Sequence, residues 1–276
     1  MVRPLVLFGA FVALLCAADP RDIIRKAVEM DERNAPLAAH YNFLQRELVR
    51  EFDHAGKVKS ERTETFNVIS VGGSPYKRLV AHNDQPLSPA ADRAEEEKIR
   101  EVAEERRHET AEQREKRIEE WRKHQERYHE PLHELANAFN FTVAGEETRD
   151  GRATYRIEGT PRPDYKPKST YTAFFPKVKL RAWIDKTDFQ ASRIEIEAFD
   201  TISFGGFLVR LEKGSQIVIE QTRMGDSLWL PSRVSITAAA RLLLVKNWNR
   251  EMDYSFSEFR KIQPDSSLVL LHPIGR

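Results

Sequence analysis

From residue 140 to residue 261 the chain repeatedly alternates apolar and polar residues, and this period of two constrains the fold more than any other feature. The alternation runs through LRAWID, FQASRIEIEAF, SQIVIEQTR, SLWLPSRVSITA and EMDYSFSEF. Alternation of this kind is typical of strands in an antiparallel sheet with one apolar and one polar face. Helical patterns occur elsewhere in the chain, so we expect an α+β fold.

The alternation also predicts which side chains share the apolar face. The residues expected to share it are Ile184, Ile194, Ile196, Leu228, Leu230, Val234, Ile236, Met252, Tyr254 and Phe256.

Two apolar segments, 201–211 and 240–248, lack the alternation and are expected to be short helices or loops packed on the sheet. The first contains Phe204, Phe207 and Leu208 around a Gly-Gly pair. Apolar side chains on a backbone that can bend suit a mobile lid, and a static plug that completes the core is the alternative.

The first part of the chain predicts further strands after a short helix. IIRKAVEMDER (23–33) has a helical pattern. The runs 41–52 and 58–71 read as strands joined by a turn at Gly56, and GGSP precedes another strand at 76–83. Residues 141–147 and 152–159 predict a hairpin around Asp150-Gly151.

A strongly charged segment at about 88–130 interrupts the strands. It begins with Ser88-Pro89, a favourable start for a helix, and is rich in Glu, Arg, Lys and Ala. Its few apolar residues are Ile99, Val102, Ile118 and Trp121. We expect a charged helical insertion, either a solvated helix lying across the domain or a partner-binding arm. Sustained heptads are missing, which disfavours a coiled coil.

The N-terminal residues 1–18 are typical of a secretory signal. Arg3 precedes an apolar stretch at 5–15, and Cys16-Ala17-Ala18 follows, so we expect cleavage near Ala18 and a periplasmic protein with a single domain over 19–276. A lipid anchor at Cys16 is the weaker alternative, because Leu15 precedes the cysteine. No later segment is apolar enough to span a bilayer. The net charge of +1 gives no support for nucleic-acid binding.

One enzyme motif occurs, His129-Glu130-Pro131-Leu132-His133, which matches the H-E-x-x-H zinc signature. Glu146 or Glu147 could supply a third ligand. Pro131 within the motif and the charged flanks argue against a zinc helix, so a zinc hydrolase is a remote alternative and exposed histidines at a helix boundary are expected. The other common nucleophile and nucleotide motifs are absent, and we predict a non-enzyme without a cofactor. Trp183, Trp229 and Trp248 could stack on a ligand or fill the core.

Two segments carry a resemblance to a known family. The run from Leu180 to Asp188 that continues to Arg193-Ile194-Glu195, and the later GDSLWLPSRVSI (225–236), resemble the strand–turn–strand units of LolA-like carriers, the outer-membrane lipoprotein-sorting superfamily. The resemblance covers 140–261 best, 20–87 weakly, and 88–130 not at all.

The resemblance implies a strongly curved antiparallel sheet, an incomplete β-barrel whose concave face is covered by helices. It further implies that the ten residues of the apolar face line a ligand cavity. It implies a periplasmic carrier of lipoprotein acyl chains or another lipid, with a membrane-associated donor or acceptor protein as partner and no catalytic or metal residues. The alternative is a non-catalytic interaction or scaffold protein that uses the charged helix 88–130.

Overall fold

The computed structural model describes residues 19–262 except 54, 205–208 and 243–245. Within this part of the chain there are three α-helices, α1 (Pro20–Ala38), α2 (Pro89–His108) and α3 (Ala111–Ala138), and a short 3-10 helix, η1 (Phe175–Lys177). The strands are β1 (Tyr41–Phe52), β2 (Val58–Val71), β3 (Ser74–His82), β4 (Gln85–Pro86), β5 (Phe139–Arg149), β6 (Arg152–Pro161), β7 (Val178–Asp185), β8 (Ala191–Ala198), β9 (Ile202–Phe204), β10 (Val209–Leu211), β11 (Gln216–Met224), β12 (Leu228–Leu242) and β13 (Lys246–Lys261).

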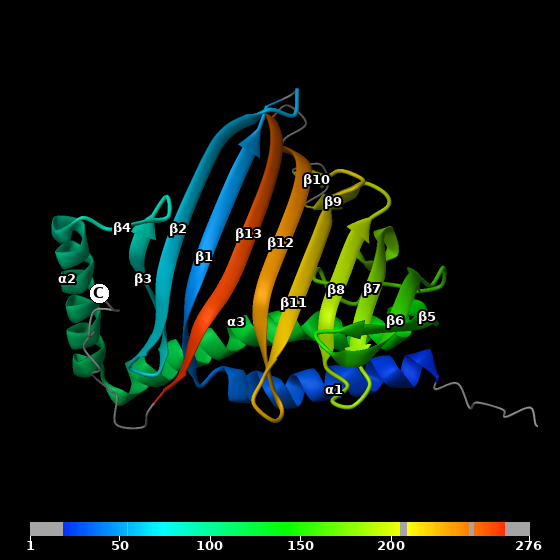
Figure 1. The fold of residues 1–276 in the computed structure, drawn as a ribbon, viewed down its shortest axis with the longest axis horizontal. Helices are drawn as coiled ribbons and strands as arrows, with labels where there is room; N and C mark the ends of the chain where they lie inside the picture. Colours follow the sequence, from blue (N-terminus) through cyan, green and yellow to red (C-terminus); the bar gives the residue numbers. More distant parts are fainter. Residues whose placement is uncertain (1–18, 54, 205–208, 243–245, 263–276) are drawn as a thin grey trace, which may run out of the picture.

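The strands form one 13-stranded antiparallel sheet, which confirms the α+β class. Its main path is β4-β3-β2-β1-β13-β12-β11-β8-β7-β6-β5, and β10 and β9 branch from β12. Strand β13 lies between β1 and β12, so the last strand of the chain connects the strands β1–β4 with the strands β5–β12 in a single sheet (Figure 1). The sheet is broad and open with β4 and β5 at its edges, not the strongly curled half-barrel that the resemblance implied.

Helices α1 and α3 run side by side across the strands near one end of the sheet (Figure 1). Helix α1 begins after Asp19, whose side chain accepts a hydrogen bond from the Arg21 amide, with Pro20 in the first helical position. Ile23, Ile24 and Ala27 form its buried stripe. They pack on the sheet, so α1 is held by the apolar stripe that its sequence predicts.

The charged insertion is two helices instead of one. Helix α2 ends at His108, Glu109 is extended, and Thr110 starts α3 with a capping box that it shares with Gln113. Helix α3 then continues through Pro131 to Ala138, so the expected boundary at Pro131 is wrong. Proline removes one helical hydrogen bond, and the carbonyl that it leaves free belongs to the exposed Arg127, which water can reach.

The insertion lies against the β2–β3 turn. The Arg106 guanidinium donates to the carbonyls of Val71 and Ser74, and Arg117 donates to the Gly72 carbonyl at 2.9 Å. A side chain at Gly72 would place its Cβ 3.1 Å from the Cβ of Arg106, so the turn approaches the helix closely. Helix α2 is therefore docked on the body of the protein instead of projecting as a free arm.

The segments without alternation are strands and not short helices. Residues 202–204 and 209–211 are β9 and β10, and β10 pairs with the end of β12. Residues 240–242 and 246–248 extend β12 and β13 as one long pair. A short continuous apolar run does not distinguish a helix from a strand by its period, which is why the expectation failed.

Candidate functional site

The strand register aligns apolar side chains in two rows across the middle of the sheet. One row joins Ile194, Ile219, Val234 and Tyr254 on neighbouring strands. The next row joins Ile196, Ile217, Ile236, Met252 and Val49. We call these two rows the apolar face.

Helices α1 and α3 cover only one side of this face. Ile196 packs with the buried residues Ala138 and Phe139 at the end of α3, whereas Ile157 and Ile184 lie beneath α1. The residues of the rows on β11, β12, β13 and β1 are only half-buried. Contacts of α1 reach β12 and β5, and those of α3 reach β5 and β3. A strip of branched aliphatic side chains over β11 to β1 therefore remains accessible to solvent.

The ten predicted lining residues divide into two groups. Ile184 and Leu230, each 1% exposed, are part of the buried interior. The other eight are half-buried: Ile194, Ile196, Leu228, Val234, Ile236, Met252, Tyr254 and Phe256.

A β-bulge corrects the prediction for β12. Glu220 pairs with Arg233 but Gln221 pairs with Pro231, so one residue of β12 has no partner there. The extra residue interrupts the period of two. The alternation therefore does not carry Leu228 and Leu230 onto the face of Val234 and Ile236.

The sequence analysis missed Ile217, Ile219 and Val49. The run Gln-Ile-Val-Ile-Glu at 216–220 conceals the alternation because Val218, on the opposite face, is also apolar. Val49 has Glu47 and Glu51 two residues to either side on the same face of β1, and only its pairing with Met252 reveals its place in the row.

The opposite face of the same strands is charged. Arg193 bonds to Glu195 and Glu220, and Arg233 bonds to Asp253. Trp183 is buried on this face with the guanidinium of Arg193 5.7 Å from its ring centre. The contrast between the two faces confirms the one-sided sheet that the alternation predicts.

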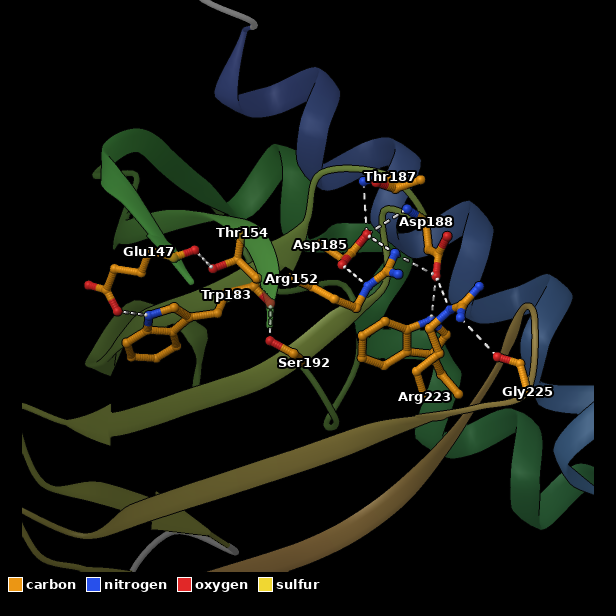
Figure 2. A network of polar contacts seen from close by, with 11 residues as sticks. Glu147, Arg152, Thr154, Trp183, Asp185, Thr187, Asp188, Ser192, Arg223 and Gly225 are labelled. Atoms are coloured by element: carbon orange, nitrogen blue, oxygen red, sulfur yellow. Dashed lines mark hydrogen bonds and ion pairs between the residues drawn. The ribbon is translucent and has the colours of Figure 1, made fainter. Parts of the chain in front are cut away.

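The turn after β7 is held by a buried carboxylate. Asp185 is 1% exposed, and its Oδ1 accepts hydrogen bonds from the amides of Thr187 (2.8 Å) and Asp188 (2.7 Å). Arg152 adds a bidentate contact at 2.5 and 2.8 Å. Figure 2 shows these groups converging on the turn, where Asp188 also meets Arg223. This network fixes the strand–turn–strand unit 180–195.

The charge of Asp185 is stabilised despite its burial. Burial alone would raise its pKa, but Arg152 and the amides of Asp188 and Thr187 hold the pKa below its ordinary value. The group is therefore ionised at neutral pH and acts as a structural anion.

The same end of the sheet anchors α1. The Asn34 side chain, which is buried, donates to the Trp229 carbonyl at 2.7 Å and accepts from the Trp229 amide at 2.9 Å. Gln190, at the end of the turn, donates to the Met30 carbonyl at 2.6 Å. Buried Trp229 thus anchors helix α1. Trp248 is half-buried near the start of β13, where the Arg250 guanidinium lies 4.9 Å from the centre of its ring.

The H-E-x-x-H motif lies in an open groove of about 570 Å³ between α1 and α3. His129 Nδ1 is 3.4 Å from Asp31, and His133 Nδ1 is 3.1 Å from Glu32. Asp31 raises the pKa of His129 against the effect of partial burial. The two histidines of α3 therefore face acidic side chains of α1 across the groove.

The expected third zinc ligands are engaged elsewhere. Glu147 accepts from the Trp183 indole at 2.8 Å, and Glu146 contacts Lys186 at 2.6 Å. Among the described residues, no three His, Cys, Asp or Glu side chains come together as a metal site. The zinc alternative thus has no support in the geometry of this groove.

Several predictions fall outside the described residues. These are the secretory signal at 1–18, which includes Cys16, and Phe207 and Leu208 of the expected lid. The third lid residue, Phe204, is described as the last residue of β9. Within the described ranges, no helix combines the length and the apolar character that crossing a membrane requires.

No family model matches the chain, and no curated protein sequence does either. Among solved structures it is similar to a Vibrio parahaemolyticus domain named for outer membrane lipoprotein sorting, at 11% identity and a TM-score of 0.35, over 89% of this chain and 97% of that one. A LolA superfamily protein from Nitrosomonas europaea matches at 11% identity and a TM-score of 0.30, over 90% and 94%. The MucA/MucB structure from Pseudomonas aeruginosa matches at 9% identity and a TM-score of 0.26, over 89% and 100%.

Each of these similarities extends along most of this chain.

Proposed function

We propose that the chain is an exported periplasmic carrier that binds an acyl chain of a lipoprotein or another lipid on its apolar face. The observation that supports this proposal is the strip of half-buried aliphatic residues over β11, β12, β13 and β1. A protein that only needed a core would cover such a strip with its own helices. Here the buried apolar clusters of α1 and α3 lie over β5–β8, whereas Asn34 and Arg117 contact only the starts of β12 and β3, and the strip stays half-buried.

The dimensions of the strip suit a long acyl chain. The row that contains Ile217 joins five strands, from β8 to β1. At about 4.8 Å between strands it extends roughly 19 Å. Each methylene that leaves water contributes about 0.8 kcal/mol, so a chain laid across the row can bind without specific polar contacts.

The composition of the strip favours binding over catalysis. The one titratable group within the two rows as defined is Tyr254, and the charged residues at their β1–β2 end, such as Glu47, are engaged in ion pairs, Glu47 with Lys77 at 2.6 Å. Burial, followed by the nearby Glu47 carboxylate, raises the pKa of Tyr254, so its hydroxyl stays protonated at neutral pH. Loading and release would involve a membrane-associated donor or acceptor protein.

The test compares two neighbouring residues of β11 that lie on opposite faces. Ile217→Ser removes aliphatic surface from the strip, and Val218→Ser makes a similar change on the charged face. We expect Ile217→Ser to weaken binding of a fluorescent fatty acid by about tenfold, because it removes two to three buried methylene equivalents. Val218→Ser should bind like the unaltered protein.

Thermal melts establish that both variants fold. Equal loss of binding in the two variants, or no saturable binding by the unaltered protein, would contradict the proposal.

A further inference from the structure

An aromatic cluster ends the accessible strip where β13 leaves the sheet. Phe43 of β1 lies 5.8 Å from Phe256 and 5.6 Å from Phe259 of β13, measured between ring centres. All three rings are half-buried. Leu37, near the end of α1, is 53% exposed. These four apolar side chains are therefore only partly covered by the described residues.

The chain leaves the sheet beside this cluster. The last described contact is the Ile262 amide donating to the His40 carbonyl at 2.8 Å, next to the Tyr41–Lys261 pair. Residues 263–276 follow, and they contain four consecutive apolar residues, Leu268 to Leu271. The only charged residues of this segment are Asp265 and Arg276, although 32% of the whole chain is charged.

The reach of this segment matches the cluster. Leu268 follows Ile262 by six residues, which an extended chain covers in about 20 Å. Phe256 precedes Ile262 by six residues along β13, which is also about 20 Å. A chain that reverses at Gln263-Pro264 runs back beside β13 from residue 265, so Leu268 to Leu271 can reach the level of Phe259 to Phe256.

We propose that Leu268 to Leu271 fold back onto Phe43, Phe256 and Phe259 and compete with the acyl chain for this end of the apolar face. This inference rests on the proposed function in naming the competitor as an acyl chain. The segment shares the chemistry of that ligand, since it offers aliphatic carbon without charge. If it occupied the face nine-tenths of the time, the apparent affinity for a ligand would fall about tenfold.

The test uses the protein without residues 266–276, together with a full-length variant carrying Leu268→Ser and Leu270→Ser. His272→Ser in the same segment is the matched control. The first readout is hydroxyl-radical labelling, which does not involve lipid. We expect labelling of Phe43, Phe256 and Phe259 to rise several-fold in the truncated and serine variants, while the buried Phe139 and Phe175 stay unchanged.

The second readout is titration with a fluorescent fatty acid. We expect both altered proteins to bind on the order of tenfold more tightly, and His272→Ser to match the unaltered protein. A synthetic peptide of residues 263–276 should reverse the gain of the truncated protein.

The outcomes separate the two proposals. Unchanged labelling of the three rings would overturn the docking. Protection that appears only as protein concentration rises would also overturn it, since the covering chain would then belong to a second copy. Increased labelling with no fatty-acid binding by any variant would leave the docking intact and refute the proposed carrier function instead.

Discussion

Asn in place of Asp185 should destabilise the fold by disrupting the turn after β7. The carboxylate accepts four hydrogen bonds, two from Arg152 and one each from the amides of Thr187 and Asp188. The asparagine keeps one oxygen for the amides but loses the bidentate pair with Arg152. Arg152 then remains beside a neutral, buried group.

Removing one partner of a buried pair typically costs about 3–5 kcal/mol. Because Arg152 is 28% exposed and keeps a contact with Asp188 at 3.1 Å, we expect the lower end, about 3 kcal/mol. For a domain of this size that corresponds to a fall in the melting temperature of roughly 6–12 °C. Urea unfolding with an unchanged slope measures the loss directly.

Asp164→Asn is the matched control, since Asp164 forms a similar arginine pair with Arg162 but is 71% exposed. It should leave stability nearly unchanged. The reasoning would be refuted if Asp185→Asn lost less than about 1 kcal/mol, because the carboxylate would then not hold the turn.

Because the pKa of Asp185 is lowered in the folded protein, the stability loss caused by Asp185→Asn should depend on pH. Since its folded pKa lies below the unfolded value of about 3.9, its contribution is fully present above that value and is lost as the pH falls through the folded pKa. The stability difference between Asp185→Asn and the unaltered protein should therefore be constant near neutrality and narrow below about pH 4.

Two further predictions concern the attachment of α1. Asn34→Ala leaves the buried amide and carbonyl of Trp229 without partners and should cost about 2–4 kcal/mol in urea unfolding; a loss under about 0.5 kcal/mol would show that α1 does not depend on this anchor. His129 has a folded pKa above 6.5 because of Asp31, so its stabilising contribution is present below that value and declines as the pH rises through the folded pKa. His129→Gln should flatten this decline in thermal melts between pH 6 and 8, and an unchanged profile would contradict the pairing.

The strands that are bounded by clear turn signals could be predicted closely. Segments expected at 41–52 and 58–71 are β1 and β2, because the turn signal at Gly56 and the break at Gly72-Gly73 mark their ends. The hairpin around Asp150-Gly151 was likewise found as β5 and β6. Local chemistry alone determines these elements.

Features that depend on tertiary pairing could not be predicted. The bulge opposite Glu220 requires knowledge of which strand lies beside β11, and it moved Leu228 and Leu230 out of the expected alternation. The continuation of α3 through Pro131 depends on an exposed carbonyl that water can satisfy. The full width of the apolar face appeared only when the register placed Val49 beside Met252.

The most direct test of the central claim is photo-crosslinking with a fatty acid that carries a diazirine near the end of its acyl chain. We expect peptides from β11, β12 and β13 to be labelled, with adducts on Ile217, Ile236 or Met252, and labelling to be suppressed by excess unlabelled fatty acid. Adducts confined to the groove between α1 and α3, around Glu126 and His133, or spread without competition over both faces of the sheet, would contradict the account.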